Sequence, residues 1–219
     1  MTGAGAARGT VVVIDVIRAF TVSAYALAGG AVACRLVAEV AEARALSERI
    51  PGAVISAEVE GMPILGIAIS NSPTMVRDTD LRGRTLVQRT SSGTQGVVAA
   101  AGADRLFACG LTVASATARA ILAAEPDLVT LVATGSDRGH PEDHACAEFI
   151  EALLLGRQPD LPALLAPLYA TERYVRFVAG GWPGFPATDV ELCLDADRFG
   201  FAMPVERDEL GLRLTALPT

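Results

Sequence analysis

Thr10–Asp15, which is TVVVID in one-letter code, decides the fold because a run of β-branched residues ends there on an acid. A continuous apolar run of this length is typical of a strand that is covered on both faces, as in a parallel sheet. The alanine-rich stretch that follows, up to about Ala28, predicts a helix that stops at Gly29-Gly30. The chain therefore begins as a strand followed by a helix, which is the repeating unit of α/β folds.

The same alternation continues along the chain. Further strands are predicted at Val32–Val37, Ala53–Ala57, Arg84–Gln88, Asp104–Ala108 and Leu128–Ala133. Helices are predicted at Glu39–Ile50, Gln95–Ala101, Val113–Ala124 and Pro141–Leu155. We expect an α/β fold with a mainly parallel or mixed sheet, helices on both faces and a C-terminal peripheral layer. Residues 1–156 should form the core with the site, and residues 157–219 should form helices or a lid that pack on it as one structural unit.

Composition narrows the possible functions. The 219 residues are 51% hydrophobic with a formal net charge of −7, which argues against nucleic-acid binding through neutralised phosphates. The chain has no lysine, so Schiff-base chemistry and a Walker-type phosphate lysine are excluded, and an anion must be bound by arginines, hydroxyls and backbone N–H groups. The four cysteines form no CxxC pair, and we find no export signal or membrane segment. These features predict a cytoplasmic protein with reduced thiols.

Four polar clusters follow predicted strands. They are Asp15 with Arg18, Glu58 with Glu60, the turn Arg89–Thr94 and the loop Thr134–Asp143. In open α/β sheets, ligands bind beyond the carboxyl ends of the strands, where such clusters come together. We therefore expect Asp15, Glu58, Ser92 and Asp143 to converge on one pocket.

Asp15 and Arg18 are the first candidate pair. A carboxylate at the end of a buried strand needs a partner, a metal or a raised pKa. The alternative for Asp15 is a helix cap. Arg18 lies one turn later, where a guanidinium suits a phosphate, sulfonate or carboxylate. The alternative for Arg18 is an ion pair with Asp15.

The turn after the strand Arg84–Gln88 is rich in hydroxyl groups. Thr90, Ser92, Gly93 and Thr94 come directly before or at the start of a predicted helix. The free N–H groups of a helix start, together with hydroxyls, make a cradle for an anion, so we assign these residues to substrate binding. An ordinary capped turn between a strand and a helix is the alternative.

Glu142 and Asp143 open the helix at Pro141. Acids favour the positive end of a helix, so good helix-start chemistry is one reading of this pair. The other reading is a magnesium site, because carboxylate oxygens are ligands for hard cations that bridge to phosphates. His140 and His144 with Glu148 also resemble one face of a zinc site, although no cysteine is spaced to complete it.

Several short motifs occur together over residues 10–205. DVIRA at Asp15–Ala19, NSP at Asn71–Pro73 and TSSGT at Thr90–Thr94 are followed by Glu142-Asp143 with Cys146-Ala147. In order and spacing these motifs resemble the 2-phosphosulfolactate phosphatases of coenzyme M biosynthesis and their bacterial relatives. The chain departs from that pattern at Phe20, Val59, Ala68 and Ser92.

This resemblance implies magnesium-dependent hydrolysis of a phosphate monoester on a small sulfonated or carboxylated acid. It assigns catalytic roles to Asp15, Arg18, Glu58 and Asp143, and adds Asn71 and Ser72 to the substrate-binding residues. Metal binding by Asp15, Glu142 and Asp143 is expected, and direct attack by Asp15 and attack by an activated water both remain open. We also expect a homo-oligomer.

Other classes of protein remain for comparison. A haloacid-dehalogenase-type phosphatase needs a second Asp at position 17, where this chain has Ile17, and an isochorismatase-like cysteine hydrolase needs a lysine. The alternative from another functional class is a non-catalytic binder or sensor of a small phosphorylated or carboxylated metabolite.

Overall fold

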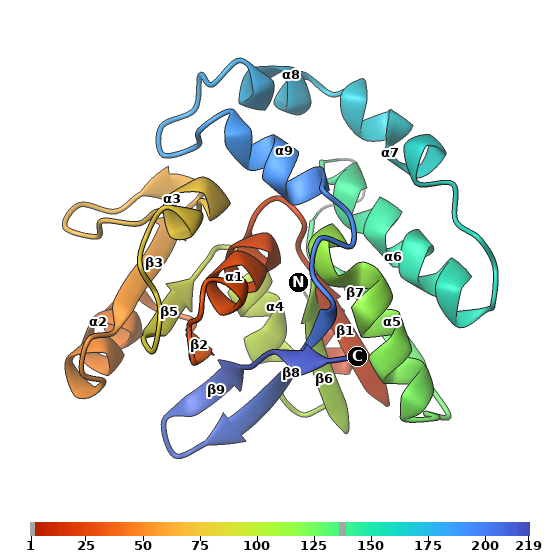
Figure 1. Cartoon of the computed structure of the whole chain (residues 1–219), viewed down its shortest axis with the longest axis horizontal. Coiled ribbons are helices and arrows are strands. Elements are labelled where there is room, and N and C mark those ends of the chain that lie inside the picture. The colour runs from red at the N-terminus through yellow and green to blue at the C-terminus, as the bar shows by residue number, and fades with distance from the viewer. Residues whose placement is uncertain (1–2, 136–138) are drawn as a thin grey trace.

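A computed structural model of the chain describes residues 3–135 and 139–219 (Figure 1). In this described part, ten strands form one sheet in the order β4-β3-β5-β2-β9-β8-β6-β1-β7, with β10 paired to β8. The strands are β1 (Thr10–Ile14), β2 (Ala33–Leu36), β3 (Val54–Val59), β4 (Met62–Pro63), β5 (Thr85–Arg89), β6 (Arg105–Cys109), β7 (Val129–Ala133), β8 (Phe201–Asp208), β9 (Gly211–Leu214) and β10 (Leu217–Pro218). All six predicted strands are present, with small shifts at their ends.

Helices connect and cover these strands. They are α1 (Ala19–Ala28), α2 (Val40–Arg49), α3 (Pro73–Arg77), α4 (Gly93–Ala99), α5 (Ala114–Ala123), α6 (Pro141–Leu154), α7 (Leu161–Tyr169), α8 (Glu172–Val178) and α9 (Thr188–Leu194), with short 3-10 turns at Ala4–Ala6 and Leu111–Val113. No helix in the described residues is both long enough and apolar enough to cross a lipid bilayer.

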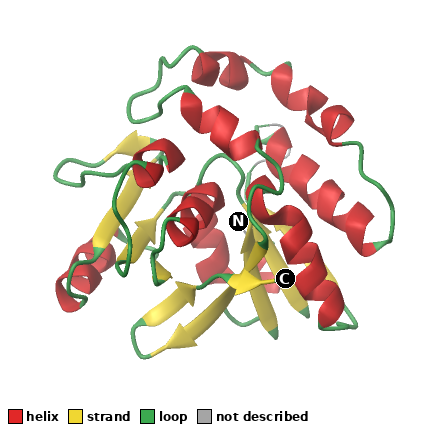
Figure 2. Ribbon diagram, in the orientation of Figure 1, coloured by secondary structure: helices red, strands yellow, loops and turns green. Residues whose placement is uncertain are grey.

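The sheet contains two groups of parallel strands. β3, β5 and β2 form one group, and β6, β1 and β7 form the other. The antiparallel hairpin β8–β9 lies between them, because β9 pairs with β2 and β8 pairs with β6. Helices α1 and α4 contact strands of both groups, whereas α2 packs against β3 and β5, and α5 and α6 pack against β6 and β7 (Figure 2).

Strand β1 lies inside the core, as its composition predicts. Val11, Val12, Val13 and Ile14 are completely buried. β6 flanks β1 on one edge and β7 on the other, so its backbone is hydrogen-bonded on both sides. β1 ends at Ile14, and Asp15 follows directly at the carboxyl end of this buried strand.

The C-terminal part of the chain is divided between two places. Helices α7, α8 and α9 form a peripheral layer across the top of the molecule in Figure 1, where α7 contacts α6 and α9 contacts α3. The expected fold class, with its mixed sheet and peripheral layer, is confirmed. Strands β8 and β9 were not predicted, since β9 is short and both pair with segments distant in sequence. The division of the chain at residue 156 stays a prediction.

Candidate active site

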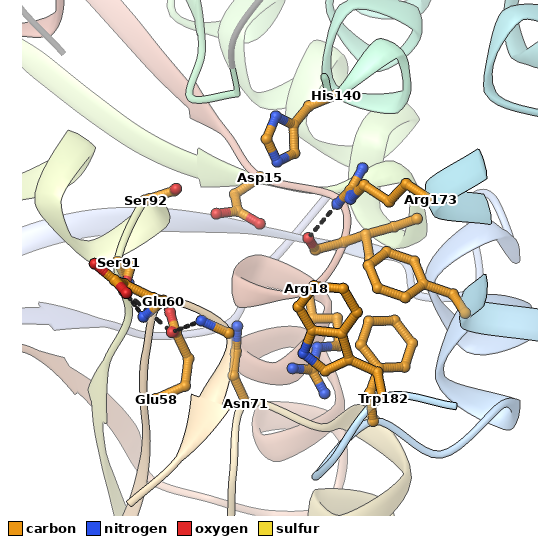
Figure 3. A pocket seen from close by; sticks show the side chains of 14 residues that line it. Asp15, Arg18, Glu58, Glu60, Asn71, Ser91, Ser92, His140, Arg173 and Trp182 are labelled. Carbon is orange, nitrogen blue, oxygen red and sulfur yellow. Dashed lines mark hydrogen bonds between the residues drawn. The ribbon is translucent and has the colours of Figure 1, made fainter. Parts of the chain in front are cut away.

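A pocket of about 340 Å³ opens at the ends of β1, β3 and β5, beneath the C-terminal layer (Figure 3). Five of the residues that the sequence assigned to catalysis or substrate binding line it: Asp15, Arg18, Glu58, Asn71 and Ser92. Other lining residues were not assigned to substrate or catalysis from the sequence, and they include Glu60, Ser91, His140, Arg173, Phe177, Trp182 and Phe185. The polar clusters after β1, β3 and β5 therefore meet in one pocket. Asp143, which was also expected there, does not line it.

Asp15 is held at the end of β1 with its carboxylate at the pocket. One oxygen accepts a hydrogen bond from the Ala19 N–H at 3.0 Å, and the other accepts one from the Thr134 hydroxyl at 3.3 Å. Burial, with the negative charges of Glu142 and Glu58, raises the pKa of Asp15 to about 6. Asp15 therefore caps the turn that leads into α1 and also presents a charge to the pocket, so the two readings of its sequence position are compatible.

Asp143 lies behind this carboxylate. Its two oxygens accept hydrogen bonds from the backbone N–H groups of Val16 at 2.7 Å and Gly135 at 3.1 Å. Burial raises the pKa of Asp143 well above its ordinary value, and the charges of Asp15 and Glu142 act in the same direction. These contacts tie the ends of β1 and β7 to the start of α6.

Glu142 is also buried, one residue earlier in α6. One of its oxygens accepts a hydrogen bond from Arg173 at 2.6 Å, while the other, Oε2, has no hydrogen-bond partner within the described residues. Burial raises the pKa of Glu142, and the charge of Arg173 opposes that rise. A buried carboxylate oxygen without a partner is costly, so this atom is a candidate ligand for a cation.

Glu58 holds the turn after β5 in place. Its carboxylate accepts hydrogen bonds from the Ser91 N–H at 2.5 Å, from the Ser91 hydroxyl at 3.1 Å and from the Gly61 N–H at 2.6 Å. With three donors, most of its hydrogen-bonding capacity is already used within the protein. Glu58 therefore joins the β3–β4 connection to the Thr90–Thr94 turn along one side of the pocket.

Thr90 and Thr94 stabilise the turn from inside. The Thr90 hydroxyl accepts a hydrogen bond from the Thr94 N–H at 3.0 Å, and the Thr94 hydroxyl accepts one from the Thr90 N–H at 2.8 Å. Both side chains are buried and neither lines the pocket. Ser92 does line it, next to the first N–H groups of α4, which no residue of the helix can satisfy.

Gly93 allows this turn to approach Asp15 closely. A Cβ atom at position 93 would lie 2.5 Å from the Ala19 Cβ and 2.9 Å from an Asp15 carboxylate oxygen. Real side chains do not come this near, so the absence of a side chain permits the contact. Gly93 therefore contributes to the site because its missing side chain leaves room for Asp15 and Ala19.

Asn71 and Ser72 occupy different positions. Asn71 lines the pocket, and its side-chain oxygen accepts a hydrogen bond from the buried Gln88 amide at 3.4 Å. Ser72 is fully buried at the start of α3, where its hydroxyl accepts from the Met75 N–H and donates to Asp189. Of the two, Asn71 is placed to meet a ligand, and Ser72 supports the wall behind it.

Arg18 makes its ion pair with the C-terminal layer and not with Asp15. Its Nη1 donates to the Asp189 carboxylate at 3.0 Å and to the Gly184 carbonyl at 2.8 Å. Burial lowers the pKa of Arg18, and the charge of Asp189 opposes that effect. Figure 3 shows the Arg18 side chain beneath Trp182 at the wall of the pocket.

Arg173 reaches the pocket from α8. It donates to Glu142, to the Gly139 carbonyl at 3.2 Å and to the Ile17 carbonyl at 3.4 Å. Two stacked rings link it to Arg18: Arg173 lies over Phe177, Phe177 stacks on Phe185 at 4.0 Å, and Arg18 lies over Phe185. No sequence motif marks Arg173, since its partners are distant along the chain.

His140 lines the pocket at the start of α6. Burial lowers the pKa of His140 to about 4, with a further contribution from the positive charge of Arg173, so the imidazole is neutral at pH 7. Across residues 3–135 and 139–219, no three His, Cys, Asp or Glu side chains are grouped to hold a metal by themselves. The zinc arrangement of His140, His144 and Glu148 considered from the sequence therefore has no support in this part of the chain.

A magnesium ion needs fewer protein ligands than the zinc site considered above. Mg²⁺ is usually bound through one or two carboxylates, with water and substrate phosphate as its other ligands. The Asp15 side chain lines the pocket. Glu142 does not line it, but its Oε2 is buried without a hydrogen-bond partner within the described residues, and its negative charge contributes to the raised pKa of Asp15. These two residues fit such an ion, whereas the oxygens of Asp143 are already bound by backbone N–H groups.

Comparisons with known proteins consistently find one family. A protein-family model described as 2-phosphosulpholactate phosphatase matches residues 2–175. A Bacillus subtilis (strain 168) protein named "Probable 2-phosphosulfolactate phosphatase" is 32% identical over 203 residues, which cover 90% of this chain and 87% of the relative. Proteins with the same name from Carboxydothermus hydrogenoformans and Symbiobacterium thermophilum are 34% and 33% identical; the matches cover 66% and 69% of this chain and 60% and 65% of those relatives.

Proposed function

Because the chain belongs to the 2-phosphosulfolactate phosphatase family, we propose that it is a magnesium-dependent phosphatase of a small acid that carries a sulfonate or a carboxylate. The family and the names of its relatives support phosphatase activity. The observation that carries the proposal is that Asp15, Arg18 and Ser92 line one pocket at the strand ends. Such a pocket offers a carboxylate for a cation together with donors for an anion.

In this proposal the carboxylates of Asp15 and Glu142 hold the magnesium ion. When bound, the ion neutralises phosphoryl oxygens and lowers the pKa of a coordinated water. Ser92 donates to the phosphoryl oxygens on which negative charge develops. Asp15 either attacks phosphorus or orients the attacking water. Asp143 holds the backbone next to Asp15 through the Val16 N–H, and Glu58 holds the turn that carries Ser92.

Arg18 and Arg173 bind the acid portion of the substrate in this arrangement. Both guanidinium groups line the pocket, and guanidinium forks suit carboxylate, sulfonate and phosphate oxygens. Asn71, held by Gln88, adds an amide next to Arg18. Each of these side chains keeps its position through contacts within the protein, which reduces the ordering required when a ligand binds.

The departures from the family's pattern fall mostly outside the pocket. Phe20 is completely buried in α1, and Val59 and Ala68 are exposed and do not line the pocket. Ser92 is the departure that does line it. Because a serine hydroxyl can still donate to a phosphoryl oxygen, this replacement is compatible with the proposed activity.

A panel of small phosphate monoesters tests the proposal. The panel pairs sulfonated and carboxylated acids with uncharged alcohols of similar size, and release of inorganic phosphate is measured with Mg²⁺ and with EDTA. We expect phosphate release from the esters of the acids, and we expect EDTA to abolish this release. Tight binding of the esters without release, across the whole panel, would instead support the sensor. The cytoplasmic location and the homo-oligomer remain predictions.

A further inference from the structure

Arg18 is held from three directions by one short segment of the C-terminal layer. Its Nη1 donates to the Gly184 carbonyl at 2.8 Å and to Asp189 at 3.0 Å. Its guanidinium carbon lies 4.0 Å from the centre of the Phe185 ring. This segment lies beyond residues 2–175, which the family model matches. The direction of a pocket arginine is therefore set by residues distant in sequence.

Asp189 is the charged member of that segment and is completely buried. While one of its oxygens meets Arg18, the other accepts hydrogen bonds from the Ser72 hydroxyl at 2.8 Å and the Thr74 N–H at 3.0 Å. The carboxylate is thus fixed by α3 and cannot follow a movement of Arg18. A guanidinium paired with such a fixed partner is itself held in one orientation.

We propose that Asp189 is a positioning residue that holds Arg18 ready for the acid portion of the substrate; this inference rests on the proposed function. Arginine has long, flexible side-chain torsions, and ordering them during binding weakens affinity. Asp189 and the Phe185 ring order the side chain in advance and leave its remaining N–H groups for a ligand. Asp189 does not line the pocket, so it acts on the substrate through Arg18.

Asp189→Asn tests this role because it keeps the shape and removes the charge that orients Arg18. Glu191→Gln is the matched control, since Glu191 is an exposed carboxylate on the same helix and its loss changes the net charge equally. Three quantities are measured: KM and kcat for the best ester of the panel, and Kd for the unphosphorylated sulfonated or carboxylated acid of that ester. We expect Asp189→Asn to raise KM and Kd about tenfold with kcat within about threefold, as for lost preorganisation of a binding group. Glu191→Gln should leave all three unchanged.

A double-mutant cycle separates positioning from general stability. Combining Arg18→Met with Asp189→Asn removes the buried cation that Asp189→Asn alone leaves unpaired, while the amide oxygen at position 189 can still accept from Ser72 and Thr74. The double variant should therefore regain part of any melting temperature lost in Asp189→Asn. KM should stay as high as in Arg18→Met alone, since removal of Asp189 has no further effect once Arg18 is absent. If Asp189→Asn does not fold by itself, the comparison of KM between the double variant and Arg18→Met still gives a result.

Two results would overturn the inference. One is a folded Asp189→Asn protein whose KM and Kd equal those of Glu191→Gln, and the other is a cycle in which the two effects on KM simply add. Failure of the proposed function looks different, because the wild-type protein would then release no phosphate from any ester. In that case Kd for an unphosphorylated sulfonated or carboxylated acid of the panel still reports whether Asp189 positions Arg18.

Discussion

Two regions of the structure differ in whether their charged groups are paired. One is the group of carboxylates around the ends of β1 and β7, and the other is the C-terminal layer. Within residues 3–135 and 139–219, neither Asp15 nor Asp143 has an ion pair with an arginine, and the negative charges of neighbouring carboxylates help to raise the pKa of each. In the layer, Asp189 meets Arg18 and Arg173 meets Glu142. Like charges gathered in a pocket are typical of functional sites, whereas paired charges typically hold a scaffold together. The comparison indicates that ion pairs hold the two arginines of the pocket in place, whereas the unpaired carboxylate of Asp15 is available for chemistry.

The largest expected effect is on the free energy of unfolding at pH 8, which Asp15→Asn should raise and Asp189→Asn should lower. Asp15 has a pKa of 3.8 in the unfolded chain and about 6 in the folded protein, so the folded state binds more protons between these values. The free energy of unfolding therefore falls as the pH rises from 3.8 to 6, by about 3 kcal/mol in all. Asp15→Asn removes this cost and should stabilise the metal-free protein at pH 8, but not below pH 4.

Asp189→Asn should do the reverse at pH 8. It leaves the Arg18 guanidinium buried without its counter-charge, which costs about 3–5 kcal/mol in buried pairs. Urea unfolding of both variants at pH 4 and pH 8, with EDTA present, measures the two free energies. If both variants are destabilised equally at pH 8, the distinction between the two regions is wrong.

Turnover should separate the same regions. Asp15→Asn keeps the hydrogen bond from Ala19 but removes the charge at the pocket, so we expect the rate of phosphate release to fall by about 10²-fold or more. The steady-state rate at saturating ester and Mg²⁺ is the measurement. Near-normal turnover together with a melting temperature lowered by several degrees would mean that Asp15 serves only as a cap.

A smaller effect is expected from crowding the carboxylate side. Gly93→Ala places a methyl group against Ala19 and Asp15, and such overpacking typically destabilises a protein by about 1–3 kcal/mol. Gly102→Ala is the control, since no atom lies within 4 Å of a Cβ at that position. Thermal unfolding of the two variants should show a loss for Gly93→Ala alone. Equal melting temperatures would indicate that the turn moves away at little cost.

The smallest effect concerns the cation. Glu142→Gln should weaken Mg²⁺ binding by on the order of tenfold, because it replaces a charged ligand oxygen by a neutral one. Titration of phosphate release against Mg²⁺ measures the change, with Glu151→Gln, an exposed position on the same helix, as the control. An unchanged Mg²⁺ requirement would remove Glu142 from the proposed metal ligands.

Local pattern accounts for what the sequence predicted well. The β-branched run in β1 and the rule that ligands gather at strand ends were enough to bring Asp15, Glu58 and Ser92 into one pocket. Asp143 could be recognised as an acid at a helix start. Its partners, the backbone N–H groups of Val16 and Gly135, could not, because sequence shows the type of a group but not its neighbours.

Long-range pairing accounts for what was missed. Arg18 and Asp189 are 171 positions apart, and Arg173 is 156 positions from its contact at Ile17. No periodicity or short motif links residues over such distances. The hairpin β8–β9 was missed for the same reason, since its place in the sheet depends on β2 and β6 and not on a strong pattern of its own.

The central place of that hairpin has a consequence for how the chain folds. Residues 201–214 emerge from the ribosome after all the strands of the two parallel groups. In the sheet, however, they lie between those groups. During synthesis each group can form its local contacts, but the edges of β2 and β6 stay unpaired until these residues arrive. Exposed strand edges favour association between chains, so a stalled or shortened chain lacking the hairpin should aggregate more readily than the complete one.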